Sequence, residues 1–302
     1  MREVLRRTLA SGPIALTMLG AASCGPGPYR CGNQIIIAGP SVKLPDGGLD
    51  CSFCTENYVV VDCYQTTLNS NPVTACDVEQ FCGGGTGRRP ASLLAAGPRD
   101  ASSSIGAYFA AAARLEEASV VAFRVLAGEL TAHGAPAALV AWCRRSAAEE
   151  ITHTRLTSML ARRYRATPER AAYARVPEVR TFEEIAAENA VEGCARESFG
   201  AVIAALQARH AADPVVARAM SSIAADELRH AELGWAVAEW CAPKLSRVAR
   251  DRIDEARALA IAALVDEQRP FSSEEQLLAG LPSAEVHSGL ATRFRSELAP
   301  LA

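Results

Sequence analysis

The sequence predicts a mainly α-helical protein in which a small cysteine-rich segment precedes a helical bundle. Alanine, the residue with the highest helix propensity, dominates the chain after about residue 100. The chain has 10 cysteines, and most of them lie in its first third. Apolar residues make up 49% of the chain and the net charge is −3. This composition is that of a folded protein, and it lacks the excess of positive charge that nucleic-acid binding requires.

The first 23 residues have the pattern of a bacterial lipoprotein signal peptide. Met1–Arg7 is basic, residues 8–23 carry no charge, and small residues precede Cys24. The end of this pattern resembles a lipobox, which implies cleavage before Cys24 and attachment of lipid to that cysteine. An ordinary cleavage site followed by a chance cysteine is the alternative. We therefore expect an exported protein, anchored by lipid on the periplasmic side. Because Gly25 follows the cysteine in place of Asp, the outer membrane is favoured over the inner one.

Residues 24–82 form a loop-rich segment that we expect disulfides to stabilise. So short a segment cannot bury enough apolar surface alone, and disulfides persist in exported proteins. An even number of cysteines predicts three bridges and leaves their pairing open. A redox or zinc role for the CxxC spacing of Cys51 and Cys54 is disfavoured, because no βαβ pattern surrounds it. The cysteines of the predicted framework are Cys31, Cys51, Cys54, Cys63, Cys76 and Cys82.

A Gly/Pro/Ser-rich linker at residues 83–104 leads into the predicted bundle at residues 105–243. Apolar residues recur there at helical spacing, and Gly or Pro interrupts the pattern at three places. The first and third interruptions are tight turns between helices, and the middle one is a polar connection of about sixteen residues. This short–long–short connectivity is that of a four-helix bundle with one long connection. Helices are expected at residues 105–133, 136–165, 182–211 and 214–242, with further ones near 246–267 and 284–298 in a C-terminal extension at 244–302.

Two Glu-x-x-His motifs lie on the second and fourth predicted helices. Glu150 precedes His153 by three residues, and Glu227 precedes His230 by three. This spacing places both side chains of a motif on one helix face, where they can share a metal ion. Each motif lies about fifteen residues beyond a predicted turn, so both fall at half the height of the bundle. The sequence therefore predicts a shared metal centre.

A two-metal centre in such a bundle also needs one glutamate from each remaining helix. On the first helix, Glu116 shares its face with apolar residues, whereas Glu117 lies beside arginines. On the third helix, Glu197 lies among small residues at the depth of Glu227, and Glu192 lies among polar ones. We choose Glu116 and Glu197, with Glu192 as a residue that orients a ligand or as the fallback.

The alternative is that these are solvated carboxylates on the surfaces of alanine-rich helices. It accounts for Glu117, Glu129 and Glu149. It does not account for Glu116 and Glu197, because an unpaired carboxylate on an apolar face is costly to bury and requires a cation or a proton.

Together these motifs resemble the ferritin-like superfamily of di-iron carboxylate proteins. The likeness covers residues 105–242 and is closer to bacterial ferritin-like domain proteins and the tRNA-hydroxylating branch than to storage ferritins. A tRNA substrate conflicts with export and with the negative charge. The resemblance implies two iron ions, with manganese as an alternative. It implies a centre bridged by Glu116, Glu150, Glu197 and Glu227, with His153 and His230 as terminal nitrogen ligands.

The superfamily includes oxygenases, peroxide scavengers and iron-storage shells, so the resemblance does not select a reaction. The enzyme hypothesis is an oxidoreductase or oxygenase that reacts with dioxygen or peroxide. Because the cysteine-rich segment lacks the paired CxxC spacing of a rubredoxin-type iron site, such an enzyme would take electrons from an external donor. The alternative is a non-catalytic metal-binding or structural envelope lipoprotein whose cysteine-rich segment binds a partner.

Overall fold

A computed structural model of the chain divides into two units, Ala15–Gly83 and Met1–Ile14 with Gly84–Ala302, each of which we describe by itself. The residues that the structure describes are 1–9, 34–40, 49, 59–68, 71–79, 88–90, 93, 103–168, 170–173, 179–265 and 271–298. Cys24, Cys31, Cys51, Cys54 and Cys82 lie outside these ranges, so lipidation and the three-disulfide framework stay predictions.

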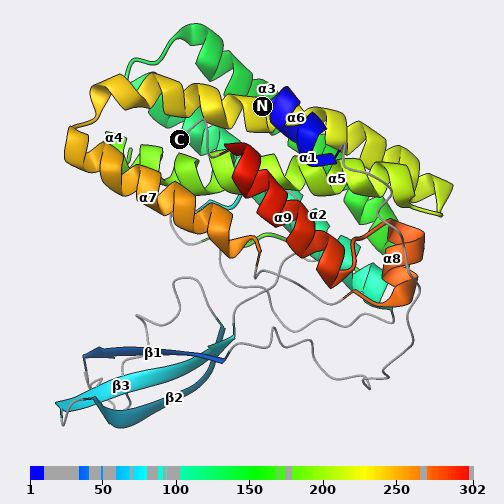
Figure 1. Ribbon diagram of the computed structural model, residues 1–302, viewed down its shortest axis with the longest axis horizontal. Helices are drawn as coiled ribbons and strands as arrows, with labels where there is room; N and C mark the ends of the chain where they lie inside the picture. The colour runs from blue at the N-terminus through cyan, green and yellow to red at the C-terminus, as the bar shows by residue number, and fades with distance from the viewer. Residues whose placement is uncertain are drawn as a thin grey trace. The chain divides into compact units, whose positions relative to one another are not determined.

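The smaller unit contains a three-stranded antiparallel sheet with the strand order β1-β3-β2 (Figure 1). Its strands are β1 (Gln34–Pro40), β2 (Val59–Leu68) and β3 (Asn71–Glu79). Runs of isoleucine and valine, which favour strands, begin β1 and β2. Cys63 on β2 is disulfide-bonded, and Cys76 is its neighbour across the β2–β3 ladder.

The larger unit contains two long helical hairpins that pack against each other through α3 and α6 (Figure 1). The first hairpin is α2 (Ser104–Ala132) and α3 (Ala137–Arg163). The second is α4 (Phe182–Glu188), η2 (Asn189–Glu197) and α5 (Ser198–His210), followed by α6 (Pro214–Cys241). These bounds lie within a few residues of the predicted ones. The mainly α class is therefore confirmed for the described residues.

The expectation of one continuous α-helix over residues 182–211 is wrong, because its middle part, η2, is π-helical. A π-helix bonds each residue to one five positions away, so it holds more residues per turn than an α-helix. Here Gly193 on η2 touches Gly234 on α6, and Asn189 donates a hydrogen bond from Nδ2 to the Gly234 carbonyl oxygen at 2.8 Å. These contacts come from another helix, so the apolar spacing of residues 182–211 does not record them.

The turns between helices carry the residues that the sequence suggested. Gly134 has a φ of +73°, which favours glycine, and it ends the turn after α2. Asp213 caps α6 by accepting a hydrogen bond from the Val215 backbone N–H at 2.8 Å. The other oxygen of Asp213 accepts bonds from Arg163 Nε at 2.8 Å and from the Tyr164 hydroxyl at 2.7 Å. One carboxylate thus links the end of α3 to the start of α6.

Four shorter helices surround the hairpins: α1 (Arg2–Leu9), α7 (Arg247–Ala263), α8 (Ser273–Ala279) and α9 (Ala284–Leu298). The helices α7 and α9 were expected, whereas α1 and α8 were not. Helix α1 covers the basic start of the predicted signal peptide. It contacts α5 and α9, and its Val4 and Thr8 are buried. Among the helices of the described residues, none is long and apolar enough to cross a membrane.

Two of the three apolar clusters among the described residues contain residues of both hairpins. One contains Phe123, Leu130 and Leu233, and the other contains Phe109, Leu160 and Ile223. The Glu-x-x-His motifs fall between these clusters in the sequences of both α3 and α6. The fold therefore places polar residues at half the height of the hairpins, with apolar packing on both sides.

Candidate metal centre

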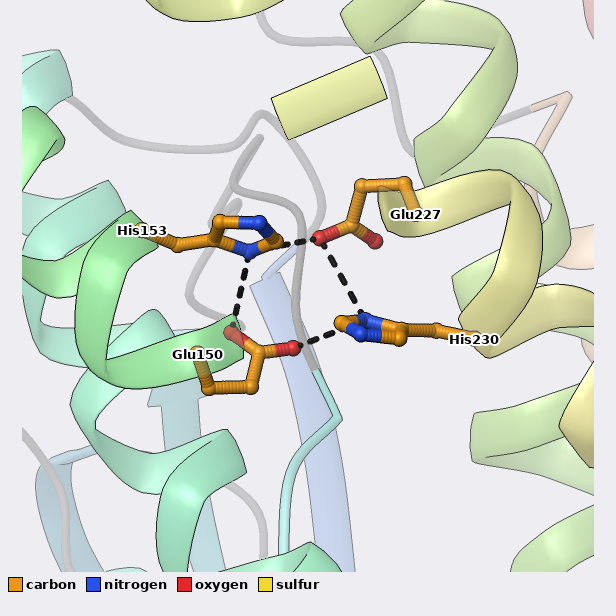
Figure 2. Close-up of side chains that lie close together, drawn as sticks. All are labelled: Glu150, His153, Glu227 and His230. Carbon is orange, nitrogen blue, oxygen red and sulfur yellow. Dashed lines mark ion pairs between the residues drawn. The ribbon is translucent and has the colours of Figure 1, made fainter. Parts of the chain in front are cut away.

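The two Glu-x-x-His motifs meet in the interior of the larger unit. Figure 2 shows Glu150 and His153 of α3 pointing toward Glu227 and His230 of α6. Each of the four offers one ligand atom, and these atoms all lie within 4.8 Å of one another. All four side chains are 0% exposed. This cluster is a candidate metal site.

The Nδ1 atoms of both histidines face the carboxylates of the cluster. Glu150 contacts one histidine with each oxygen: Oε2 lies 3.3 Å from His153 Nδ1, and Oε1 lies 3.1 Å from His230 Nδ1. Oε1 of Glu227 lies 3.3 Å from His153 Nδ1 and 3.8 Å from His230 Nδ1. Both glutamates of the motifs are therefore shared between the two histidines.

The other ring nitrogens point away from the cluster and are held by carboxylates. Nε2 of His153 lies 3.1 Å from Asp226 Oδ2, and Nε2 of His230 lies 3.0 Å from Glu149 Oε2. A carboxylate accepts only, so it fixes the proton on Nε2 and leaves the Nδ1 lone pair free to bind a metal. Arg229 contacts both Glu149 and Asp226 and ties the two supporting carboxylates together.

The glutamates chosen on the other two helices flank this cluster. Glu116 Oε2 lies 3.8 Å from His153 Nδ1, and Glu197 Oε2 lies 3.9 Å from His230 Nδ1. Both carboxylates are 0% exposed. Glu192 is not brought to the cluster. It pairs with Arg196 at 2.9 Å and accepts a hydrogen bond from the Arg89 backbone N–H at 3.0 Å.

The protein atoms alone leave this cluster incompletely satisfied. The side-chain oxygens of Glu150, Glu197 and Glu227 and the Nδ1 atoms of His153 and His230 are buried without a hydrogen-bond partner. Buried polar atoms are costly unless they bond or coordinate a cation. Because these atoms converge, one kind of ligand, a metal ion, would satisfy all of them.

The pKa values of the buried glutamates also indicate that the cluster requires positive charge. Burial raises the pKa of Glu116 and of Glu197 well above the usual value, and neighbouring carboxylates raise it further. For Glu150, burial is outweighed by its contacts with His153 and His230, which lower its pKa to about 2. For His153, burial alone would lower the pKa, but the contacts with Asp226 and Glu150 outweigh it, so the pKa of this histidine is raised. Bound divalent cations would neutralise the negative charge of these buried carboxylates.

Sequence reasoning missed the residues that support the histidines. Glu149 was expected to be a solvated carboxylate, but it is 18% exposed and holds His230. Glu129 was also expected at the surface, yet it is 5% exposed and pairs with Arg180 at 2.7 Å. The available signal was that an acidic residue, Glu149 or Asp226, directly precedes the glutamate of each motif. Which histidine each one holds depends on the packing of α3 against α6.

Comparison of the chain with protein-family models, with curated proteins and with solved structures found no match. The structure brings together two histidines and two shared glutamates, flanked by one further glutamate on each side. Carboxylate and imidazole ligands suit divalent iron, manganese and zinc.

Proposed function

We propose that the larger unit is a ferritin-like four-helix bundle that holds two iron ions and reacts with dioxygen or peroxide in the bacterial cell envelope. The observation that carries this proposal is the doubling of the site. Glu116 lies beside His153, Glu197 lies beside His230, and Glu150 presents one oxygen to each histidine. A single metal ion would not require ligands on both sides of the cluster, whereas two ions would use the four glutamates and both histidines. Four carboxylates also match the charge of two divalent cations.

The glutamates and histidines of the cluster would form two metal positions. Glu116 and His153 would hold one ion and Glu197 and His230 the other, while Glu150 and Glu227, which lie near both histidines, would contribute to both. Two iron ions, when bound, would supply redox chemistry toward dioxygen or peroxide. Asp226 and Glu149 hold the imidazole rings in place, and such supporting carboxylates also strengthen the metal ligands.

The packing around the cluster would exclude bulk water. The ring of Phe123 lies 5.1 Å from the ring of His230, centroid to centroid, and apolar clusters lie on both sides. Electrons for repeated turnover would come from a separate donor. The described cysteines of the larger unit, Cys143, Cys194 and Cys241, are free thiols on different helical segments.

Metal analysis of paired variants tests the proposal. Wild-type protein purified without chelators, reduced and loaded with Fe²⁺, should hold two iron ions per chain and consume dioxygen. Glu197→Ala should lose iron and oxygen uptake, because it removes a buried ligand beside His230. Glu192→Ala, the matched control five residues away, should keep most of both, because Glu192 is paired with Arg196.

Two outcomes would contradict the proposal. Wild-type protein that binds no iron, or binds zinc alone without oxygen uptake, would exclude the di-iron centre. Two iron ions retained by Glu197→Ala but lost by Glu192→Ala would show that the ligand on this helix is the wrong one. Circular dichroism of each variant checks that the helices are intact, and alanine at either position suits a helix.

A further inference from the structure

A buried arginine from the segment before the bundle lies against the π-helical part of the second hairpin. Arg88 is 1% exposed, although the sequence suggested a linker at this position. Its Nη1 donates a hydrogen bond to Asn189 Oδ1 at 3.1 Å, and its carbonyl oxygen accepts one from the Ser119 hydroxyl at 3.0 Å. Its Nη2 also lies 3.7 Å from Glu188 Oε1, so the buried guanidinium is paired with a carboxylate of α4, directly before the π-helix.

The contacts of this segment converge on η2. Asn189, which accepts the bond from Arg88, donates its own bond to the Gly234 carbonyl oxygen of α6. The next residue of the segment, Arg89, donates its backbone N–H to Glu192. A Cβ at Gly193 would lie 3.0 Å from Arg88 Nη1, so glycine at this position leaves room for the guanidinium. Arg88 thus contacts the first residue of the π-helix, and Arg89 bonds to the side chain of Glu192 in its middle.

The same guanidinium lies one aromatic ring away from the metal centre. Its Cζ is 6.0 Å from the centroid of the Phe123 ring, which in turn packs against His230. Glu197 is the last residue of the π-helix. Arg88 is therefore near the metal centre through the Phe123 ring, although it does not coordinate a metal.

The register of the π-helix decides where Glu197 points. Successive residues of an α-helix are rotated by about 100°, so removing one extra residue from a turn rotates everything after it by about that angle. π-helical turns are rare and occur mostly at functional sites. The turn at η2 is contacted from outside the helix by Arg88 and by Gly234.

We propose that Arg88 is a positioning residue of the metal centre, which holds the π-helical segment in the register that directs Glu197 toward His230. This inference rests on the proposed two-metal site. It assigns to the segment before the bundle a part in shaping one of the two metal positions, the one formed by Glu197 and His230. The position formed by Glu116 and His153 should be much less affected.

Cobalt binding by variants of the full chain tests this inference. Co²⁺ alone is the probe, because its visible spectrum reports ligand geometry, and titration gives the stoichiometry and two affinities. Arg88→Met keeps the length of the side chain but removes its charge and its donors. We expect one Co²⁺ to bind with near wild-type affinity and the other to bind about 10–100-fold more weakly, with an altered spectrum. Arg88→Lys, which keeps the charge, should restore part of the loss.

Two controls separate positioning from general stability. Arg124→Met, at an exposed position of α2, removes an arginine next to Phe123 in the sequence and should bind both ions like the wild type. In a Glu197→Ala background, Arg88→Met should weaken binding no further, because the two changes act on the same position. Should Arg88→Met prevent folding, Arg88→Lys is expected to show the same selective loss to a smaller extent.

The outcomes distinguish this inference from the proposed function. If the wild type binds two Co²⁺ and Arg88→Met keeps both affinities and the spectrum, the positioning role is excluded and the two-metal site stands. Additive losses in the Glu197→Ala background exclude it as well. If the wild type binds no Co²⁺, the proposed function fails, and the positioning role fails with it.

Discussion

Replacing Gly234 with alanine should force α6 away from the π-helical segment, because the two backbones touch at this residue. A Cβ at position 234 would lie 2.7 Å from the carbonyl carbon of Gly193 and 2.8 Å from its carbonyl oxygen. Ordinary van der Waals contacts of a Cβ begin at 3.4 Å. The neighbour is backbone rather than a flexible side chain, so the helices themselves must move apart.

The size of the effect follows from two opposing contributions. Alanine is favoured over glycine in a helix interior by about 1 kcal/mol, which stabilises the variant. Overpacking typically costs about 1–3 kcal/mol, and a backbone neighbour places this site at the upper end of that range. We therefore expect Gly234→Ala to lower the free energy of unfolding by about 1–2 kcal/mol from these two terms.

Gly128→Ala is the matched control within α2. Nothing lies within 4 Å of a Cβ at this exposed position, so only the helix preference remains. It should raise the free energy of unfolding by about 0.5–1 kcal/mol. Urea denaturation followed by circular dichroism measures both variants against the wild type. The contact between the helices would be refuted as a constraint if Gly234→Ala proved as stable as Gly128→Ala.

Two further predictions concern a helix cap and the free thiols. Asp213→Ala should lower the free energy of unfolding by about 1–2 kcal/mol, whereas Asp213→Asn, which can still cap α6, should lose less in the same urea assay. Although burial raises the pKa of Asp213, Tyr164 and Arg163 lower it to about 2, below its usual 3.8. Its contribution is therefore complete above about pH 4 and is lost as the pH falls through 2, where the gap between wild type and Asp213→Asn should close. Burial also raises the pKa of all three free thiols of the larger unit. Iodoacetamide at pH 8 should modify them only in denaturant, as peptide mass mapping would show; labelling of the native protein would contradict their burial.

The sequence by itself determined the helices and the residues at the heart of the site. Alanine-rich stretches broken by Gly134 and by Asp213-Pro214 placed the turns, because these residues end or begin helices wherever they occur. The spacing of Glu150 with His153, and of Glu227 with His230, put each pair on one face. Both inferences use only neighbours along the chain, and local geometry is enough for them.

Tertiary structure alone decided which groups meet across the site. Glu149 of α3 holds the histidine of α6, and Asp226 of α6 holds the histidine of α3. The π-helical segment packs closely against α6 where Gly193 meets Gly234, and Arg88 reaches Asn189, a residue 101 positions further along the chain. Each of these contacts joins residues that are distant in sequence. They exist only once packing has brought the helices together, so no spacing along the chain could indicate them.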